Sequence, residues 1–168
     1  MQRSVRPPDL VWEAMVRLEQ NAPMAEQATE TMEIAAPPDQ ILHVLLDFEA
    51  YPSWAKDLKG VTVESRDESG RAREVTFRAA AMGRSTSYTL RYDHGPSHLA
   101  WELVRGDIMR KLDGSYELAP GGTDGRTLAT YHLAVDLVIP LPSFVKRRAE
   151  QKIIHTALRE LRAHVEAR

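Results

Sequence analysis

The feature that most constrains the fold is the last stretch of the chain, Leu141 to Ala167, which has the pattern of one long amphipathic helix. About 25 helical residues extend about 38 Å at 1.5 Å per residue, enough to cross a small domain. We expect the rest of the chain to supply a sheet that this helix covers. One side of the helix carries residues at steps of three and four: Glu150, Ile154, Ala157, Leu158, Leu161 and Val165.

Size and composition indicate one ordinary globular domain of 168 residues, with 43% hydrophobic and 27% charged residues. The net charge of −2 argues against nucleic-acid binding, which usually needs a strongly basic domain. The absence of cysteine excludes disulfides and thiolate chemistry. No apolar run approaches the ~20 residues of a membrane span, and no secretory signal is evident at the N-terminus. We therefore expect a cytoplasmic protein.

Alternating apolar and polar residues predict seven strands, with a helical insertion after the first. That insertion begins at Pro38 and continues to Asp47, followed by a short aromatic turn or second helix. Short loops between successive strands indicate antiparallel hairpins, and one apolar face per strand indicates a sheet with one solvated side. The predicted fold class is therefore α+β. The expected strands are 28–34, 61–66, 72–80, 86–92, 98–104, 109–118 and 127–138.

Four sequence elements resemble those of a known superfamily. They are Ala-Pro-Pro-Asp-Gln-Ile from Ala36, then Asp47-Phe-Glu-Ala-Tyr-Pro-Ser-Trp, Asp113-Gly-Ser-Tyr-Glu-Leu, and the junction from Tyr131 to Pro140. Together they resemble the START-like (SRPBCC) superfamily, in its polyketide cyclase/dehydrase-type branch, over about residues 28–166. The resemblance implies a helix-grip fold, in which a seven-stranded antiparallel sheet curls round the C-terminal helix and leaves a hydrophobic cavity. Members bind lipids, sterols, polyketides, hormones or quinones, and a minority catalyse ring closure or dehydration.

If the apolar faces point inward, the cavity wall is aromatic with a few hydroxyls, as is usual for small-molecule pockets. The alternative is a filled core in which each tyrosine hydroxyl finds a backbone or water partner. The residues alone favour neither, and the resemblance favours the cavity. The predicted ligand-binding residues are Tyr51, Trp54, Phe77, Tyr88, Tyr92, Trp101, Tyr116, Tyr131, Ile154 and Leu158.

Catalysis would require a positioned acid or base in the cavity. The alternation leaves only tyrosines there as proton donors, so no catalytic residue is predicted. A one-residue slip or bulge would change this, because it reverses the face of each side chain. Asp93, His94 and His98 flank a turn that fits a solvated hairpin better than a metal site; we expect no metal and no cofactor. The ionisable residues predicted to point outward are Arg78, Arg91, Lys111, Asp113, His132 and Asp136.

A basic cluster, Lys146-Arg147-Arg148 with Lys152, begins the terminal helix. Such clusters are usually solvated faces, and the alternative is a weak contact of the cavity mouth with anionic lipid headgroups. Because the apolar stripe is continuous only from Ile153 onward, we expect the C-terminal half of the helix to plug the sheet. The N-terminal half should border a pocket or its mouth.

The leading hypothesis is a binder or carrier of a hydrophobic small molecule, lipid or polyketide-like, acting as a monomer or homodimer. The enzyme alternative is a polyketide aromatase/cyclase or dehydratase, with an Arg, His or acid in the cavity beside a tyrosine. A third class is a protein-interaction module, which would show an exposed apolar patch.

Residues 1–27 are predicted to form an extension, with a short helix over 9–20, before the domain at 28–168. Because Met24 looks like a natural start, deleting residues 1–23 should leave the thermal midpoint near that of the full chain. Differential scanning calorimetry measures this, and a large drop would instead show that the segment packs on the core.

Overall fold

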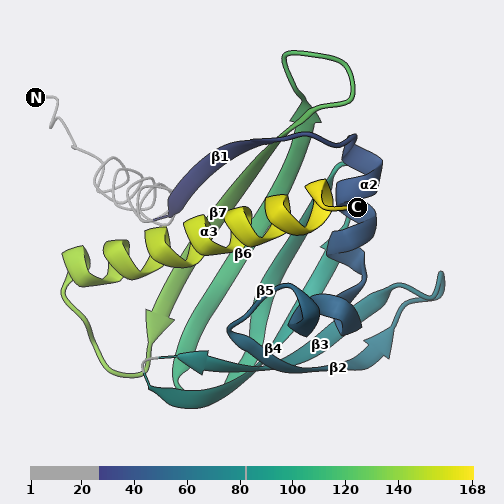
Figure 1. Cartoon of the computed structure of the whole chain (residues 1–168). Helices are drawn as coiled ribbons and strands as arrows, with labels where there is room; N and C mark the ends of the chain where they lie inside the picture. The colour runs from purple at the N-terminus through teal and green to yellow at the C-terminus, as the bar shows by residue number, and fades with distance from the viewer. Residues whose placement is uncertain (1–26, 82) are drawn as a thin grey trace, which may run out of the picture.

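The computed structural model describes residues 27–81 and 83–168, which form a seven-stranded antiparallel sheet with one long helix across its concave face (Figure 1). The expected α+β architecture is confirmed. The expected helix over 9–20 and domain start near Met24 lie outside the described residues. The elements in chain order are β1 (Ala28–Ile34), α2 (Pro38–Leu46), the 3-10 helix η1 (Phe48–Ser53), β2 (Leu58–Arg66), β3 (Ala72–Ala81), β4 (Arg84–His94), β5 (His98–Gly106), β6 (Met109–Pro120), β7 (Thr127–Leu137) and α3 (Ser143–Glu166).

The strands lie in the order β1-β7-β6-β5-β4-β3-β2, so β2 to β7 form a meander and the first strand pairs with the last. The predicted strands are all present. β2 begins three residues earlier than expected, at Leu58, because a register shift between Leu58 and Gly60 hides the alternation at its start. In the described residues, no helix is long and apolar enough to cross a membrane.

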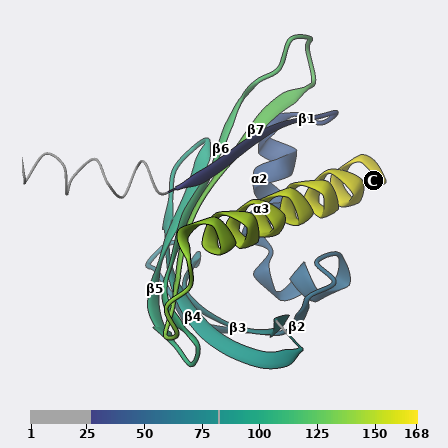
Figure 2. The ribbon, with the colours of Figure 1, turned by 90° about the vertical axis from the view of Figure 1, so that its left-hand side faces the viewer.

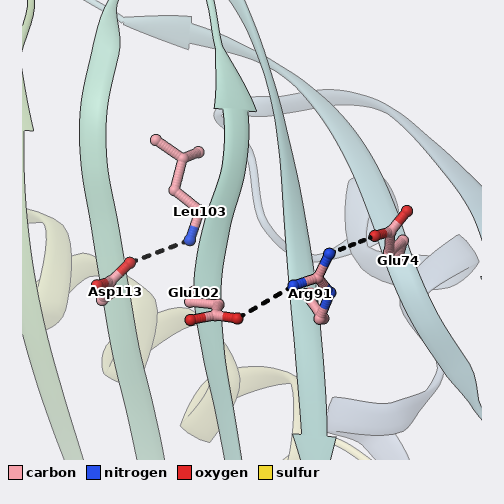
Figure 3. Close-up of polar contacts among 5 residues, drawn as sticks. All are labelled: Glu74, Arg91, Glu102, Leu103 and Asp113. Atoms are coloured by element: carbon pink, nitrogen blue, oxygen red, sulfur yellow. Dashed lines mark hydrogen bonds and ion pairs between the residues drawn. The ribbon is translucent and has the colours of Figure 1, made fainter.

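The sheet curls strongly, so that β2, β3 and β4 turn beneath α3 (Figure 2). Register shifts interrupt the β2–β3, β4–β5 and β6–β7 ladders, and such bulges increase local twist. The pairing of β5 with β6 ends at Trp101 opposite Gly114. Beyond that point the Leu103 N–H donates to the Asp113 carboxylate at 3.0 Å (Figure 3). A side chain thus replaces the backbone partner where the two strands separate.

Gly114 is required by the aromatic core that crosses the middle of the sheet. A Cβ atom at this position would lie 2.6 Å from the Trp101 ring and 2.6 Å from the His132 carbonyl oxygen. The Trp101 ring in turn contacts Tyr92, Tyr116 and Tyr131, with centroid distances of 5.9, 5.6 and 5.4 Å. Gly114 therefore lets the indole pack closely against β6.

The helix α3 buries the predicted stripe except for Ala157, which is partly buried. Glu150, Ile154, Leu158, Leu161 and Val165 are all buried, and α3 packs against β1, β7 and α2. The chain before it turns at Pro140, and Pro142 precedes the first helical residue, where a missing N–H removes no hydrogen bond.

Three glutamates of α3 each accept a backbone N–H from a different segment. Glu150 accepts from Val135 of β7 at 2.9 Å, Glu160 from Lys56 after η1 at 2.8 Å, and Glu166 from Ala35 after β1 at 2.9 Å. Hydrogen bonds to carboxylates are stronger than those between neutral groups. These contacts therefore tie the helix to the sheet and to both ends of the α2–η1 insertion.

Replacing Gly114 with Ala should destabilise the fold by about 1–3 kcal/mol, as overpacking of a well-packed core does. Urea unfolding followed by tryptophan fluorescence measures the change. Gly122→Ala is the matched control, because a Cβ there meets no atom within 4 Å and its φ is not in the left-handed region. Equal midpoints for the two variants would contradict the proposed requirement for Gly114.

Candidate ligand-binding pocket

A pocket of about 970 Å³ lies between α3 and the curled half of the sheet. Its wall runs along α3 from Ser143 to Glu160 and includes the β7–α3 loop, Val138 to Leu141. The opposite wall comes from the start of β2, the end of β3 and the starts of β4 and β6. The pocket exists because, among the strands, α3 packs against β1 and β7. The strands β2 to β4 turn beneath α3 at a distance, which leaves a space between them and the helix. The N-terminal half of α3 thus borders the pocket, as the sequence predicts, and the pocket also extends into the C-terminal half as far as Glu160.

Apolar side chains make up most of the pocket wall, among them Leu58, Ile108, Met109, Leu112 and Val135. Ionisable groups are interspersed with them. A wall of this kind suits a molecule with a large apolar body and a few polar groups. The ionisable lining residues are Asp57, Arg110, Asp136, Lys146, Lys152 and Glu160.

The predicted ligand-binding residues lie mostly beside this pocket rather than in it. Of the ten, all of which are described, Tyr88 lines the pocket and Trp54 is partly buried. The other eight are buried in the core and do not line the pocket: Tyr51, Phe77, Tyr92, Trp101, Tyr116, Tyr131, Ile154 and Leu158. A ligand role for these side chains stays a prediction.

The aromatic side chains fill space by contacting one another. Tyr116 meets Tyr131 edge to face with ring centroids 4.5 Å apart, and Phe48 lies 4.4 Å from Tyr92. Tyr51 donates its hydroxyl to the Leu45 carbonyl oxygen at 2.5 Å. Offset and edge-to-face pairs of this kind add about 0.5–1.5 kcal/mol beyond the area they bury. The aromatic faces read from the sequence therefore form the core that supports the pocket.

Trp54 packs against the C-terminal end of α3. Its ring stacks on His164 of α3 with centroids 5.6 Å apart and an interplanar angle of 14°. Nearby, Lys56 donates its backbone N–H to Glu160, and the same loop supplies Ala55 and Asp57 to the pocket wall. The Tyr-Pro-Ser-Trp element thus positions one wall of the pocket through the backbone that follows it.

Asp136 corrects the expected orientation of the ionisable residues. The alternation places it outward, yet it lines the pocket and forms an ion pair of 2.5 Å with Lys146 of α3. The alternation fails here because the sheet is irregular near the end of β7. The described part of β1 begins opposite Leu133, so it does not extend beside Asp136, and β6 has a register shift between Met109 and Lys111. Asp136 therefore lies at an open edge, within reach of the helix.

Other ionisable residues do point outward, as expected. Arg91 pairs with Glu74 at 3.1 Å and with Glu102 at 3.3 Å on the face turned away from α3 (Figure 3). Asp113 lies on the same face. His132 contacts Thr29 at 2.8 Å and Glu117 at 3.6 Å, which joins β1, β6 and β7. These groups connect neighbouring strands and lie outside the pocket wall.

The tyrosine hydroxyls remain protonated across the physiological range. Burial raises the pKa of Tyr88, and burial is also the main cause of the raised pKa of Tyr51, Tyr92, Tyr116 and Tyr131. In the pocket, Tyr88 is therefore a neutral hydrogen-bond donor or acceptor and not a base.

Sequence reasoning missed the β7–α3 loop and the strand starts, which supply much of the pocket wall. One signal was present in the sequence: the run Leu137-Val-Ile-Pro-Leu141 is apolar on both faces, unlike a half-solvated strand. Such a run predicts contact with something apolar on each side. The sequence does not show which apolar surface this run contacts, because that depends on where α3 lies.

The family model described as polyketide cyclase / dehydrase and lipid transport matches residues 25–166. A START superfamily protein from Mycobacterium smegmatis is similar with a TM-score of 0.80 and 24% identity, over 84% of this chain and 97% of that one. No curated protein matches the sequence.

Two further solved structures share the fold at lower identity. The Zhui aromatase/cyclase from a Streptomyces species has a TM-score of 0.67 and 17% identity, over 83% of this chain and 93% of that one. A STAR-related lipid transfer protein fragment from Xanthomonas axonopodis has a TM-score of 0.61 and 19% identity, over 83% and 85%. These likenesses establish the fold.

Replacing Glu160 with Ala should loosen the loop that forms one pocket wall, because the Lys56 N–H then loses its acceptor. A hydrogen bond to a carboxylate contributes about 1.5 kcal/mol or more, so the Lys56 amide should exchange about tenfold faster. Amide hydrogen exchange measures this. Glu160→Gln keeps an acceptor oxygen and should preserve most of the protection; equal exchange in both variants would contradict the assignment.

Proposed function

The chain belongs to the polyketide cyclase/dehydrase and lipid transport family, and on that premise we propose that it binds and carries a hydrophobic small molecule in the pocket beside α3. Proteins of this family bind hydrophobic small molecules. The observation that carries the proposal is the pocket of about 970 Å³ with its mostly apolar wall. This volume lies at the upper end of the range of about 300–1,000 Å³ that small-molecule sites occupy.

The energetic case rests on water. Water in contact with the apolar side chains of Leu112, Val135 and Ile153 is released when an apolar ligand covers them. Such burial contributes about 25 cal/mol for each Å² of apolar surface. A lipid or polyketide-like molecule supplies such surface. Polar groups on the ligand can meet Tyr88, Thr86 or the ionisable residues of the wall.

The second candidate is a polyketide aromatase/cyclase or dehydratase, and one observation favours it. Tyr88, Asp136 and Lys146 line the same pocket. They supply a protonated phenol, a carboxylate and an ammonium, the groups that general acid–base chemistry uses. The 2.5 Å ion pair between Asp136 and Lys146 fits a structural contact across the β7–α3 junction equally well. Carriage therefore remains the leading proposal.

Replacing Ala157 with Trp should fill the pocket, because Ala157 lines it and its side chain is small. Binding of N-phenyl-1-naphthylamine, a neutral apolar fluorescent probe, should weaken about tenfold or more, equivalent to at least about 1.4 kcal/mol. Fluorescence titration measures the change. Ala163→Trp makes the same substitution at an exposed position of α3 outside the pocket and should bind like the original protein.

Native mass spectrometry of the purified full chain supplies the second readout. A carrier should retain an apolar compound that is released on denaturation, and Ala157→Trp should retain less of it. Equal probe binding by Ala157→Trp and Ala163→Trp would exclude the pocket as the site. Conversion of a bound compound to a lighter or cyclised product would instead support the enzyme hypothesis, provided that Asp136→Asn abolishes the conversion.

A further inference from the structure

We infer that the end of the molecule around the pocket mouth docks on a lipid surface with anionic headgroups. The purpose of this docking rests on the proposed function, because it would let an apolar ligand pass between the bilayer and the pocket. The docking surface itself is defined by two independent features, exposed apolar side chains and exposed cationic ones. Both can be tested without knowing the ligand.

Exposed apolar side chains are concentrated at this end. Among the described residues, six large hydrophobic side chains are exposed, and five of them lie between positions 138 and 153. We call these five the mouth patch. Ile139 and Phe144 are each 72% exposed. Isolated exposed apolar residues are ordinary, whereas several that gather on one loop and the helix after it are typical of an interaction site. The mouth patch consists of Val138, Ile139, Phe144, Val145 and Ile153.

Exposed cationic side chains occur on the same helix as part of the mouth patch and at the start of β6. Arg147, Arg148 and Lys152 are exposed on α3, and Arg110 is exposed at the start of β6. Within the part of the chain that the structure describes, no salt bridge involves any of these four. The first turn of α3 contains no acidic residue, so the positive end of the helix dipole adds to the same potential. This end is basic although the whole chain has a net charge of −2.

Two carboxylates at this end have other partners. Asp136 pairs with Lys146, and Asp107 accepts hydrogen bonds from the Thr86 hydroxyl at 2.5 Å and the Ser87 N–H at 3.0 Å. They therefore do not neutralise Arg147, Arg148 or Lys152 through direct ion pairs. Cationic side chains around protruding apolar ones match a membrane surface, where headgroups meet the charges and the apolar tips enter the acyl boundary.

The mouth patch is continuous with the pocket. Val138, Ile139 and Ile153 belong to both, and Lys152 lines the pocket as well. A ligand that leaves between α3 and the β7–α3 loop would therefore meet the docked surface directly. This continuity distinguishes the mouth patch from Leu128, the sixth exposed apolar side chain, which lies near the opposite end of β7 and outside the pocket wall.

A lipid surface fits these features better than a second copy of the chain. A two-fold contact would place the same patch on both subunits, which brings Arg147, Arg148 and Lys152 of one copy toward those of the other. Like charges brought together across an interface oppose association. Anionic headgroups reverse the sign of that interaction.

The test is flotation of the full chain with vesicles of phosphatidylcholine, with and without phosphatidylglycerol. The protein should float with the anionic vesicles and lose binding as salt is raised. Replacing Arg147 and Arg148 together with Gln should weaken binding roughly 25-fold, from about fivefold for each charge near an anionic surface. Phe144→Glu should weaken it at least about tenfold, because it removes apolar insertion and adds repulsion. Leu128→Glu is the matched control and should float like the original protein.

Neither Phe144, Arg147 nor Arg148 lines the pocket. These variants should therefore bind N-phenyl-1-naphthylamine in solution unchanged, which separates docking from ligand binding. The inference is overturned if the full chain does not float with anionic vesicles, or floats equally with neutral ones. It is also overturned if Leu128→Glu loses as much binding as Phe144→Glu. A dimer in light scattering that Phe144→Glu dissociates would assign the patch to a second copy instead.

Discussion

The packing of α3 on β1 and β7 is the interaction on which the rest of the structure depends. Ile154, Leu158, Leu161 and Val165 bury one side of the helix, and contacts of α3 with β1 and β7 follow from them. Burying each such side chain contributes about 1.5–3 kcal/mol. Because the helix is held to one half of the sheet, the strands that curl beneath its other side cannot close on it along its N-terminal half. The pocket is the space that remains.

Polar contacts then hold the helix at a defined position along the sheet. The backbone N–H groups of Val135, Lys56 and Ala35 each donate to a glutamate of α3. Glu150 is buried, where a carboxylate is costly unless it is hydrogen-bonded. Val135 lies beyond the point where β1 begins, so its N–H would otherwise lack a neighbouring strand. The carboxylate of Glu150 therefore completes the sheet edge at the level of the pocket.

The two ends of α3 consequently differ in character. At the C-terminal end, the helix meets α2 and the stacked ring of Trp54, and its apolar residues are covered. At the N-terminal end, Ile139 and Phe144 are exposed beside Arg147 and Arg148. The C-terminal end of α3 thus belongs to the core, and its N-terminal end borders the pocket.

Local sequence patterns determined the elements of this protein. Alternation with period two predicted each strand, the three- and four-residue steps predicted the buried stripe of α3, and short loops predicted antiparallel pairing. The run from Tyr51 to Trp54 and the run from Asp113 to Leu118 resemble elements of the superfamily, and they indicated it. These properties depend on neighbours along the chain, so a single sequence contains them. The change from the apolar stripe after Ile153 to basic residues before it also predicted which half of the helix borders the pocket.

Only the tertiary structure decided where the empty space lies. Periodicity assigns Tyr92, Trp101, Tyr116 and Tyr131 to the inner face but does not say whether a ligand or another ring fills the space before them. In the structure these rings contact one another, and the pocket of about 970 Å³ is lined by other residues. Likewise the orientation of Asp136 depended on the end of β1 and the register shift in β6, which are relations between distant strands. The depth of a side chain and the edge of a sheet are set by packing between segments, and no local pattern encodes them.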